Sequence, residues 1–145
     1  MKLFLATDEG IVRAEGQSGE WSIKGRSLPD LHVTSIIAID GAILAGTVEG
    51  VYRSEDLGEL WHPSSEGLDE RHVRRLGLSP CPDGPGGGET GLITAGSEPA
   101  AIFYSEDRGK SWRECPEIAA MRDRYDWMLP YSPEDGCIRG FAFQR

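Results

Sequence analysis

Histidine and arginine side chains recur at matching points of this sequence, in a pattern that could bind an anion. His32 and His72 each come directly before an apolar run with the length of a β-strand, and Cys137 stands at the same point before a third run. Arginine follows two residues after His72 and Cys137, at Arg74 and Arg139. Guanidinium groups bind anions through paired, charge-assisted hydrogen bonds. If the three runs lie side by side, these side chains gather at one end of them.

A glutamate and a tryptophan are the other members of this candidate site. Glu98 lies in the turn Gly96–Ala100, which we expect on the same face as the loops that lead into the apolar runs. Trp127 lies in an aromatic-rich stretch, and a mouth lined by Arg and Trp suits an anionic or sugar-like ligand. A plainer alternative is that the His and Arg side chains only satisfy carbonyl groups at strand ends. The predicted ligand-binding residues are His32, His72, Arg74, Glu98, Trp127 and Arg139.

The candidate residues belong to an internal repeat. Leu5–Arg13 matches Ala45–Arg53, 40 residues later. A third copy contains Ala95–Tyr104 and follows a Gly- and Pro-rich stretch at 80–89, which we interpret as a surface loop. A repeat of this length with several short apolar runs is typical of a β-propeller blade, which has four antiparallel strands.

One motif marks a hairpin turn in the second and third copies. Ser54–Trp61 and Ser105–Trp112 both read Ser-Glu-Asp-x-Gly-x-x-Trp. In a tight hairpin the Ser and Asp side chains accept backbone N–H groups, the Gly takes a positive φ, and the Trp begins the returning strand. The first copy, Ala14–Trp21, keeps only the Gly-rich turn and the Trp. The predicted structural residues are Ser54, Asp56, Gly58, Trp61, Ser105, Asp107, Gly109 and Trp112.

This motif resembles the Asp-box (BNR) repeat of the sialidase-like β-propellers, and the resemblance covers nearly the whole chain. It implies that Asp56 and Asp107 are structural, since the Asp-boxes of these families lie in outer hairpins away from the catalytic face. A sialidase also needs an arginine cluster and a Tyr nucleophile, whereas Tyr52 occupies an apolar position of the repeat. We therefore expect a non-enzymatic binding or interaction propeller. The alternative is a glycan-acting hydrolase or lyase that uses Glu98, His72 and arginines.

The chain is predicted to be an all-β single domain over residues 1–145, built from three units of three, four and four strands. A surface insertion at 116–136, with one helical turn near Ile118–Arg122, leads to a last strand. The expected strands are Leu3–Ala6, Gly10–Ala14, Trp21–Lys24, Val33–Ile39, Ala42–Gly46, Gly50–Arg53, Leu60–His62, Val73–Leu78, Thr90–Ala95, Ala101–Tyr104, Ser111–Glu114 and Ile138–Phe143.

This strand count predicts half of a six-bladed ring. The first unit lacks the innermost strand of a blade, and Ile138–Phe143 is an innermost strand without a blade. Closed propellers have ~4–8 blades, so three units do not close on themselves, whereas two chains give six. We expect a homodimer in which each C-terminal strand completes the first blade of the other chain. The alternative is that the chain is part of a longer propeller.

Composition limits the partners and the compartment. With 24 acidic against 15 basic residues the net charge is −9, which disfavours nucleic acid and anionic membranes as partners. No apolar run reaches the ~18 residues of a membrane span. Three cysteines without a C-x-x-C pair favour reduced thiols and a cytoplasmic location. No cofactor or metal is predicted, because His32, His72 and Cys137 come from strands that diverge around a tunnel, beyond the ~2.0–2.3 Å bonds of one zinc ion.

Overall fold

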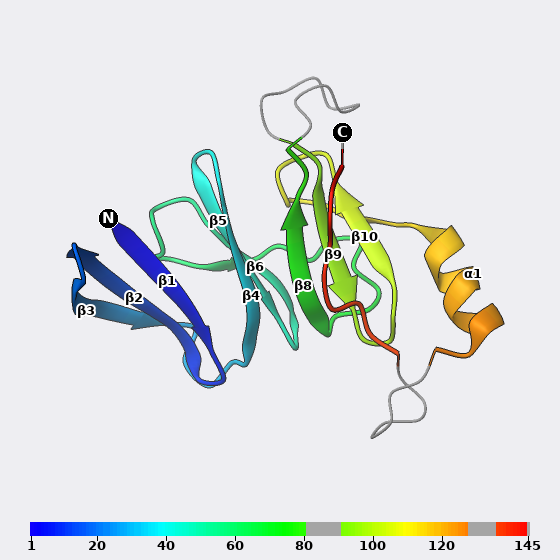
Figure 1. Ribbon diagram of the computed structural model, residues 1–145, viewed down its shortest axis with the longest axis horizontal. Helices are drawn as coiled ribbons and strands as arrows, with labels where there is room; N and C mark the ends of the chain where they lie inside the picture. The colour runs from blue at the N-terminus through cyan, green and yellow to red at the C-terminus, as the bar shows by residue number, and fades with distance from the viewer. Residues whose placement is uncertain (81–90, 128–135, 145) are drawn as a thin grey trace.

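The computed structural model describes residues 1–80, 91–127 and 136–144, and nearly all of their regular structure is β-strand (Figure 1). The described strands form three antiparallel sheets that follow one another along the chain. The first sheet contains β1 (Lys2–Thr7), β2 (Gly10–Gln17) and β3 (Glu20–Ser27). The second contains β4 (Val33–Ile39), β5 (Ala42–Thr47), β6 (Gly50–Ser54) and β7 (His62–Pro63). The third contains β8 (Val73–Leu78), β9 (Ile93–Ser97), β10 (Ile102–Ser105) and β11 (Arg113–Glu114).

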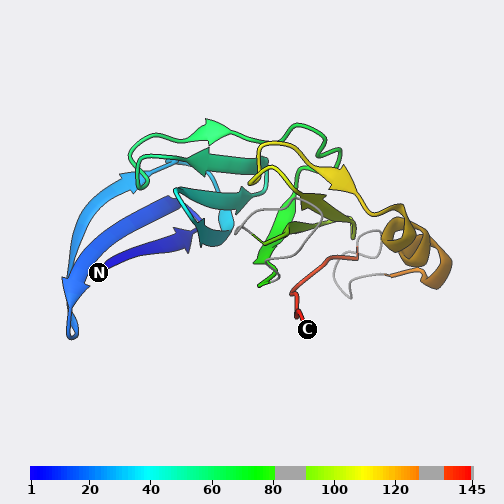
Figure 2. The same ribbon diagram turned by 90° about the horizontal axis from the view of Figure 1, so that it is seen from above.

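The sheets lie next to one another along an arc, and the hydrophobic core lies between their faces (Figure 2). Ile11, Val33 and Ala45 form one buried cluster between the first and second sheets. A larger cluster between the second and third sheets includes Leu44 and Phe103, both 0 % exposed. Each sheet therefore buries its apolar residues against its neighbours, which is why short strands with alternating apolar residues are stable here.

Tight hairpins join the strands within each sheet. The turn between β2 and β3 places Ser18 at φ 56° and Gly19 at φ 92°, the backbone geometry of the two-residue turns that match strand twist. Thr7 closes the β1–β2 turn: its hydroxyl donates to the carbonyl oxygen of Gly10 and accepts the N–H of Glu9. Thr47 makes the same two hydrogen bonds in the β5–β6 turn. The sequence repeat thus places the same threonine hydrogen bonds in the equivalent turns of the first and second sheets.

The all-β prediction and the order of three, four and four strands are confirmed. The outer strands of the second and third sheets are shorter than expected, whereas β3 extends beyond the predicted Trp21–Lys24 at both ends. Leu60 is still part of a turn, since its N–H donates to Asp56, and β7 begins only at His62. Ser111 and Trp112 pair with the segment between β7 and β8 instead of with β10. Trp112 donates its N–H to the carbonyl oxygen of Glu66 in that segment. β9 is also shifted from the predicted Thr90–Ala95 to Ile93–Ser97.

Two predictions near the C-terminus are wrong. The single helical turn is a helix of 10 residues, α1 (Pro116–Tyr125), which starts with proline and ends where Asp126 takes a left-handed conformation. Residues 136–144 form no strand within the single chain: Ile138 donates its N–H to the carbonyl oxygen of Ser97, but no strand ladder includes the segment. They lie instead along the third sheet (Figure 1). The rest of the predicted loop after Pro80, and residues 128–135 of the insertion, lie outside the described residues.

No helix of the described chain is long and apolar enough to cross a membrane.

Candidate functional site

A β-bulge near the start of β4 and another near the start of β8 leave one unpaired residue in each strand. Val33 pairs with Thr47 and Ser35 with Gly46, so Thr34 has no partner in the register. The register of β8 and β9 skips Arg74 in the same way. A bulge bends the strand and redirects the side chain of its extra residue. The bulges thus orient Thr34 and Arg74 differently from the paired residues of the same strands.

These two residues line one open pocket of about 360 Å³, which we call the mouth. Arg139, in the C-terminal segment, lines it as well. Thr34, Arg74 and Arg139 occupy the same position of the repeat, one residue after Val33, Val73 and Ile138. The mouth is therefore built from equivalent positions of successive units; its lining residues are Ala6, His32, Val33, Thr34, Arg74 and Arg139.

Two contacts between basic and acidic side chains lie at the mouth. His32 Nε2 lies 3.2 Å from Asp8 Oδ1 on the preceding sheet. Arg74 Nε lies 3.1 Å from Glu98 Oε2, and Arg74 Nη1 lies 3.5 Å from His72 Nε2. The buried oxygen Glu98 Oε2 accepts no hydrogen bond within the described residues, so its contact with Arg74 is electrostatic without hydrogen-bond alignment. The mouth and the side chains in contact with its lining thus combine two arginines, two acids and two histidines. The chain as a whole has a net charge of −9.

Five of the six predicted site residues lie in or next to the mouth. His32, Arg74 and Arg139 line it, and His72 and Glu98 contact Arg74. Trp127 does not line it: this residue follows α1, and its backbone and Cβ lie against Gly136. The sequence pattern did not predict the length of α1, and Trp127, which follows this helix, therefore lies outside the lining of the mouth.

Sequence reasoning missed two polar residues of the site, Asp8 and Thr34. Asp8 occupies the same position of the repeat as Glu98, directly after Thr7 and Ser97, so the alignment contained a signal for it. Thr34 stands where the other two copies have arginine. Its hydroxyl lies 2.6 Å from the carbonyl oxygen of Val73 and 2.9 Å from that of Gly46, linking the second sheet to the third.

The two Ser-Glu-Asp-x-Gly-x-x-Trp hairpins have nearly identical hydrogen bonds. In the third sheet Asp107 Oδ1 accepts the N–H groups of Lys110 (3.0 Å) and Ser111 (2.9 Å), and Ser105 Oγ accepts the N–H of Gly109 (2.8 Å). Ser105 also donates its hydroxyl to Asp107. In the second sheet the same roles belong to Ser54, Asp56, Gly58, Glu59 and Leu60. The predicted hairpin chemistry is thus present in both copies.

The pKa of each hairpin aspartate is below its usual range. Hydrogen bonds from Leu60 and Ser54 lower the pKa of Asp56. Partial burial raises the pKa of Asp107, but the hydrogen bonds from Ser111 and Ser105 outweigh it and lower that pKa to about 2. Both carboxylates are therefore held ionised as acceptors, which is the opposite of the raised pKa that a general acid needs.

The motif glycines pack each hairpin against the preceding sheet. A Cβ atom added to Gly109 would lie 2.3 Å from Leu44 Cδ2, and one added to Gly58 would lie 2.6 Å from Phe4 Cε1. Phe4 and Leu44 occupy equivalent positions of the repeat. The tryptophans differ more: Trp112 is buried and donates Nε1–H to the carbonyl oxygen of Ser64, whereas Trp61 Nε1 donates to Gly58.

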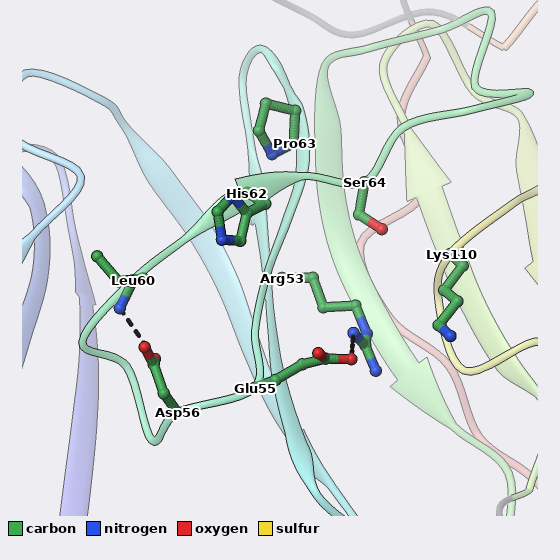
Figure 3. A pocket seen from close by; sticks show the side chains of 8 residues that line it. All are labelled: Arg53, Glu55, Asp56, Leu60, His62, Pro63, Ser64 and Lys110. Carbon is green, nitrogen blue, oxygen red and sulfur yellow. Dashed lines mark hydrogen bonds and ion pairs between the residues drawn. The ribbon is translucent and has the colours of Figure 1, made fainter.

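A second pocket, of about 310 Å³, lies beside the hairpin of the second sheet (Figure 3). Arg53, Glu55, Asp56, Leu60 and Lys110 contribute to its lining. Both acidic side chains of this pocket have partners within the chain: Glu55 pairs with Arg53, and Asp56 accepts the N–H of Leu60. Arg53 also lowers the pKa of Glu55. This pocket is therefore explained by the structure of the hairpin.

No family model and no curated protein sequence matches the chain. The resemblance to Asp-box repeats thus depends on the two motifs themselves. Within the described residues, no group of three or more His, Cys, Asp or Glu side chains is placed to hold a metal ion.

Proposed function

We propose that this chain is a non-enzymatic binding protein of the β-propeller class, in which each sheet is one blade and the mouth binds a small anionic or sugar-like ligand. The observation that carries this proposal is the convergence of Arg74 and Arg139, from equivalent positions of the repeat, and of His32 on one pocket.

The repeated packing of the three sheets supports the propeller arrangement. Each Asp-box hairpin places its glycine on the preceding sheet, Gly58 on Phe4 and Gly109 on Leu44. The same contact made twice in succession rotates each sheet relative to the last by a similar step, which places the sheets on an arc (Figure 2). Radial repetition of small antiparallel sheets is the defining feature of propellers.

The charges of the mouth support an anionic or sugar-like ligand. Two guanidinium groups, Arg74 and Arg139, line a pocket that is wide enough for a small molecule. Asp8, Glu98 and the hydroxyl of Thr34 stand nearby as hydrogen-bond acceptors. A ligand with a carboxylate and several hydroxyl groups would satisfy both kinds of side chain.

The contact between Glu98 and Arg74 favours binding over catalysis. A carboxylate that is paired with an arginine is suited to orient that arginine, whereas a general acid must keep its proton near neutral pH. Arg74 Nε stands 3.1 Å from Glu98. We therefore assign Glu98 the role of positioning Arg74 for a ligand. Cys115 and Cys137 are free thiols, which suits the reducing cytoplasm that we propose as its compartment.

Binding of D-glucuronate, with D-glucose and citrate for comparison, tests this proposal. Titration into the protein followed by NMR should shift the ring signals of His32 with glucuronate and less with glucose. Arg139→Gln should weaken glucuronate binding, whereas Arg113→Gln should not, because Arg113 is an exposed arginine paired with Glu106 on the outer hairpin. The proposal is wrong if none of the three probes shifts His32, or if both variants behave alike.

A direct assay separates binding from hydrolysis. We expect no release of 4-methylumbelliferone from its glucuronide. Release that disappears in Glu98→Gln would instead support the hydrolase alternative.

A further inference from the structure

We propose that the C-terminal segment of a second copy of this chain, residues 138–143, pairs with β1 and supplies the fourth strand of the first sheet. The pairing is reciprocal, so two copies close one ring of six sheets. This inference shares the propeller arrangement with the proposed function but does not depend on any ligand.

The free edge of β1 is the first observation. In the repeat, β1 is equivalent to β5 and β9. β5 has β4 on its inner side, and β9 has β8. β1 has no neighbour on that side among the described strands, so the first sheet has three strands where the others have four. An open edge of unpaired N–H and C=O groups favours pairing with another strand.

The exposure of two leucines on β1 is the second observation. Leu3 is 38 % exposed and Leu5 is 43 % exposed, whereas the equivalent residues of the second sheet, Ile43 and Ala45, are 4 % and 0 % exposed. The third sheet buries its equivalents equally well. In those sheets the residues are covered by the sheet that precedes them, and the described chain has no sheet before the first. Leu3 and Leu5 thus form an exposed apolar surface of the kind that usually contacts a partner.

The placement of the C-terminal segment is the third observation. A Cβ atom added to Gly96 would lie 2.5 Å from Ile138, and one added to Gly77 would lie 2.8 Å from Phe141. On the second sheet, a Cβ atom added to Gly46 would lie 2.8 Å from Val73 Cγ1. Gly46 and Gly96 are equivalent in the repeat, so Ile138 stands on the third sheet where Val73 stands on the second. The segment therefore lies where the first strand of a following sheet would begin (Figure 1).

The repeat also predicts the register of the missing pairing. In the second sheet Val33 pairs with Thr47, Ile36 with Ala45 and Ala38 with Ile43. The equivalent residues of the C-terminal segment and of β1 give three new pairs: Ile138 with Thr7, Phe141 with Leu5, and Phe143 with Leu3. Phe143 is 39 % exposed in the single chain. The pairing would place the partly buried Phe141 and the exposed Phe143 next to exposed leucines.

A second copy is the occupant that fits this edge, because the matching strand belongs to the same sequence. β1 lies in the sheet at one end of the arc, and the C-terminal segment lies on the sheet at the other end (Figure 2). Closed propellers have ~4–8 blades. With the three sheets that the described residues form, only two copies fall in this range. A two-fold axis then makes both contacts identical and leaves no open inner edge.

Ring closure would also complete the mouth. Arg139 lies on the segment that is exchanged, one residue after Ile138. In the ring, each copy would place its Arg139 on the first sheet of the other copy, near Ala6 and Asp8. The closed mouth would then contain Arg74 and Arg139 from both copies.

Disulfide trapping between single-cysteine chains tests the contact and its register. The three native cysteines are first replaced by serine. One chain then carries Leu3→Cys and the other Phe143→Cys, and the two are mixed and oxidised. We expect a covalent dimer in this mixture and in neither chain alone. In the control mixture Ile23→Cys replaces Leu3→Cys, because Ile23 is 66 % exposed but lies on β3, away from the edge. Equal cross-linking in the two mixtures, or none in the first, overturns the proposal.

Light scattering of the unsubstituted chain gives a second readout that needs no ligand. We expect twice the 15.9 kDa chain mass. Leu5→Glu should halve that mass while the far-ultraviolet spectrum stays unchanged, since a charge at the edge opposes pairing but touches no core residue of the single chain. A monomeric unsubstituted chain, or a folded Leu5→Glu dimer, refutes the pairing. Glucuronate binding can fail without changing either result, so the two proposals are tested separately.

Discussion

Removing the charge of Asp107 should destabilise the protein in a way that depends on pH. Asp107 Oδ1 accepts two backbone N–H groups and the hydroxyl of Ser105, and Oδ2 accepts the hydroxyl of Ser111 at 2.5 Å. Asp107→Asn keeps Oδ1 as an acceptor and removes the charge, but it replaces Oδ2 with an NH2 group, so the Ser111 hydroxyl must change from donor to acceptor. Asp107→Ala removes every acceptor and should lower the free energy of unfolding by about 1–2 kcal/mol, because the hairpin N–H groups lose their partners.

The magnitude for Asp107→Asn follows from the lowered pKa. A change from the usual 3.8 to about 2 corresponds to at most ~2.4 kcal/mol. The carboxylate is exposed, and water screens its interactions, so we expect about 1 kcal/mol. Since the folded pKa is below the unfolded one, this stabilisation is complete above about pH 5 and is lost as the pH falls toward 2.

Urea unfolding at a fixed protein concentration, from pH 2 to pH 7, measures this difference. The free energies of the unsubstituted protein and of Asp107→Asn should differ by a constant amount above about pH 5 and converge near pH 2. Other carboxylates titrate in both proteins and cancel. Asp123→Asn is the matched control, since Asp123 is an exposed aspartate bonded to Arg122, and it should change stability little. A difference that stays constant down to pH 2 refutes the charge argument.

Two further predictions concern packing between the sheets. Gly109→Ala should lower the free energy of unfolding by about 2–4 kcal/mol, because its Cβ would meet Leu44 at 2.3 Å in addition to the strain of φ 80°. Gly19→Ala has a similar φ with no atom within 4 Å, so it should cost only about 1 kcal/mol in urea unfolding; equal effects would contradict the packing role. Thr34→Val keeps the shape but removes the hydrogen bond to Val73, and thermal or urea unfolding should show a loss of about 1 kcal/mol. No loss would mean that this bond does not hold the second and third sheets together.

Local turn chemistry explains why so much of the fold could be predicted from the sequence. Asp107 and Asp56 determine the hairpins through bonds within five residues of themselves. Such short-range interactions can be predicted from the residues of the motif alone. The ends of the outer strands were harder to predict, because they depend on the segment between β7 and β8. The carbonyl oxygen of Glu66 in that segment accepts the N–H of Trp112, which would otherwise pair with a strand.

The candidate site was predictable wherever the repeat carried the signal. Arg74 and Arg139 occupy equivalent positions of the repeat, His32 occupies a position two residues earlier in its own copy, and all three line the mouth. Trp127 had no counterpart in the other copies, so its place depended on the length and direction of α1. That helix ends at Asp126 in a left-handed conformation, a capping geometry that the sequence pattern did not reveal.

Stability and ligand binding are expected to be separable in this architecture. The mouth is formed at β4 and β8, whereas the Asp-box hairpins join β6 to β7 and β10 to β11, at the opposite edges of the same sheets. Three strand spacings of ~4.8 Å separate these edges, roughly 14 Å. A change at Asp107 therefore reaches the mouth only by unfolding the sheet, while Arg139→Gln changes the mouth without touching a hairpin. This arrangement would let the mouth change its chemistry at the second residue of β4 and β8, since Thr34 and Arg74 already differ there while the hairpins keep the same bonds.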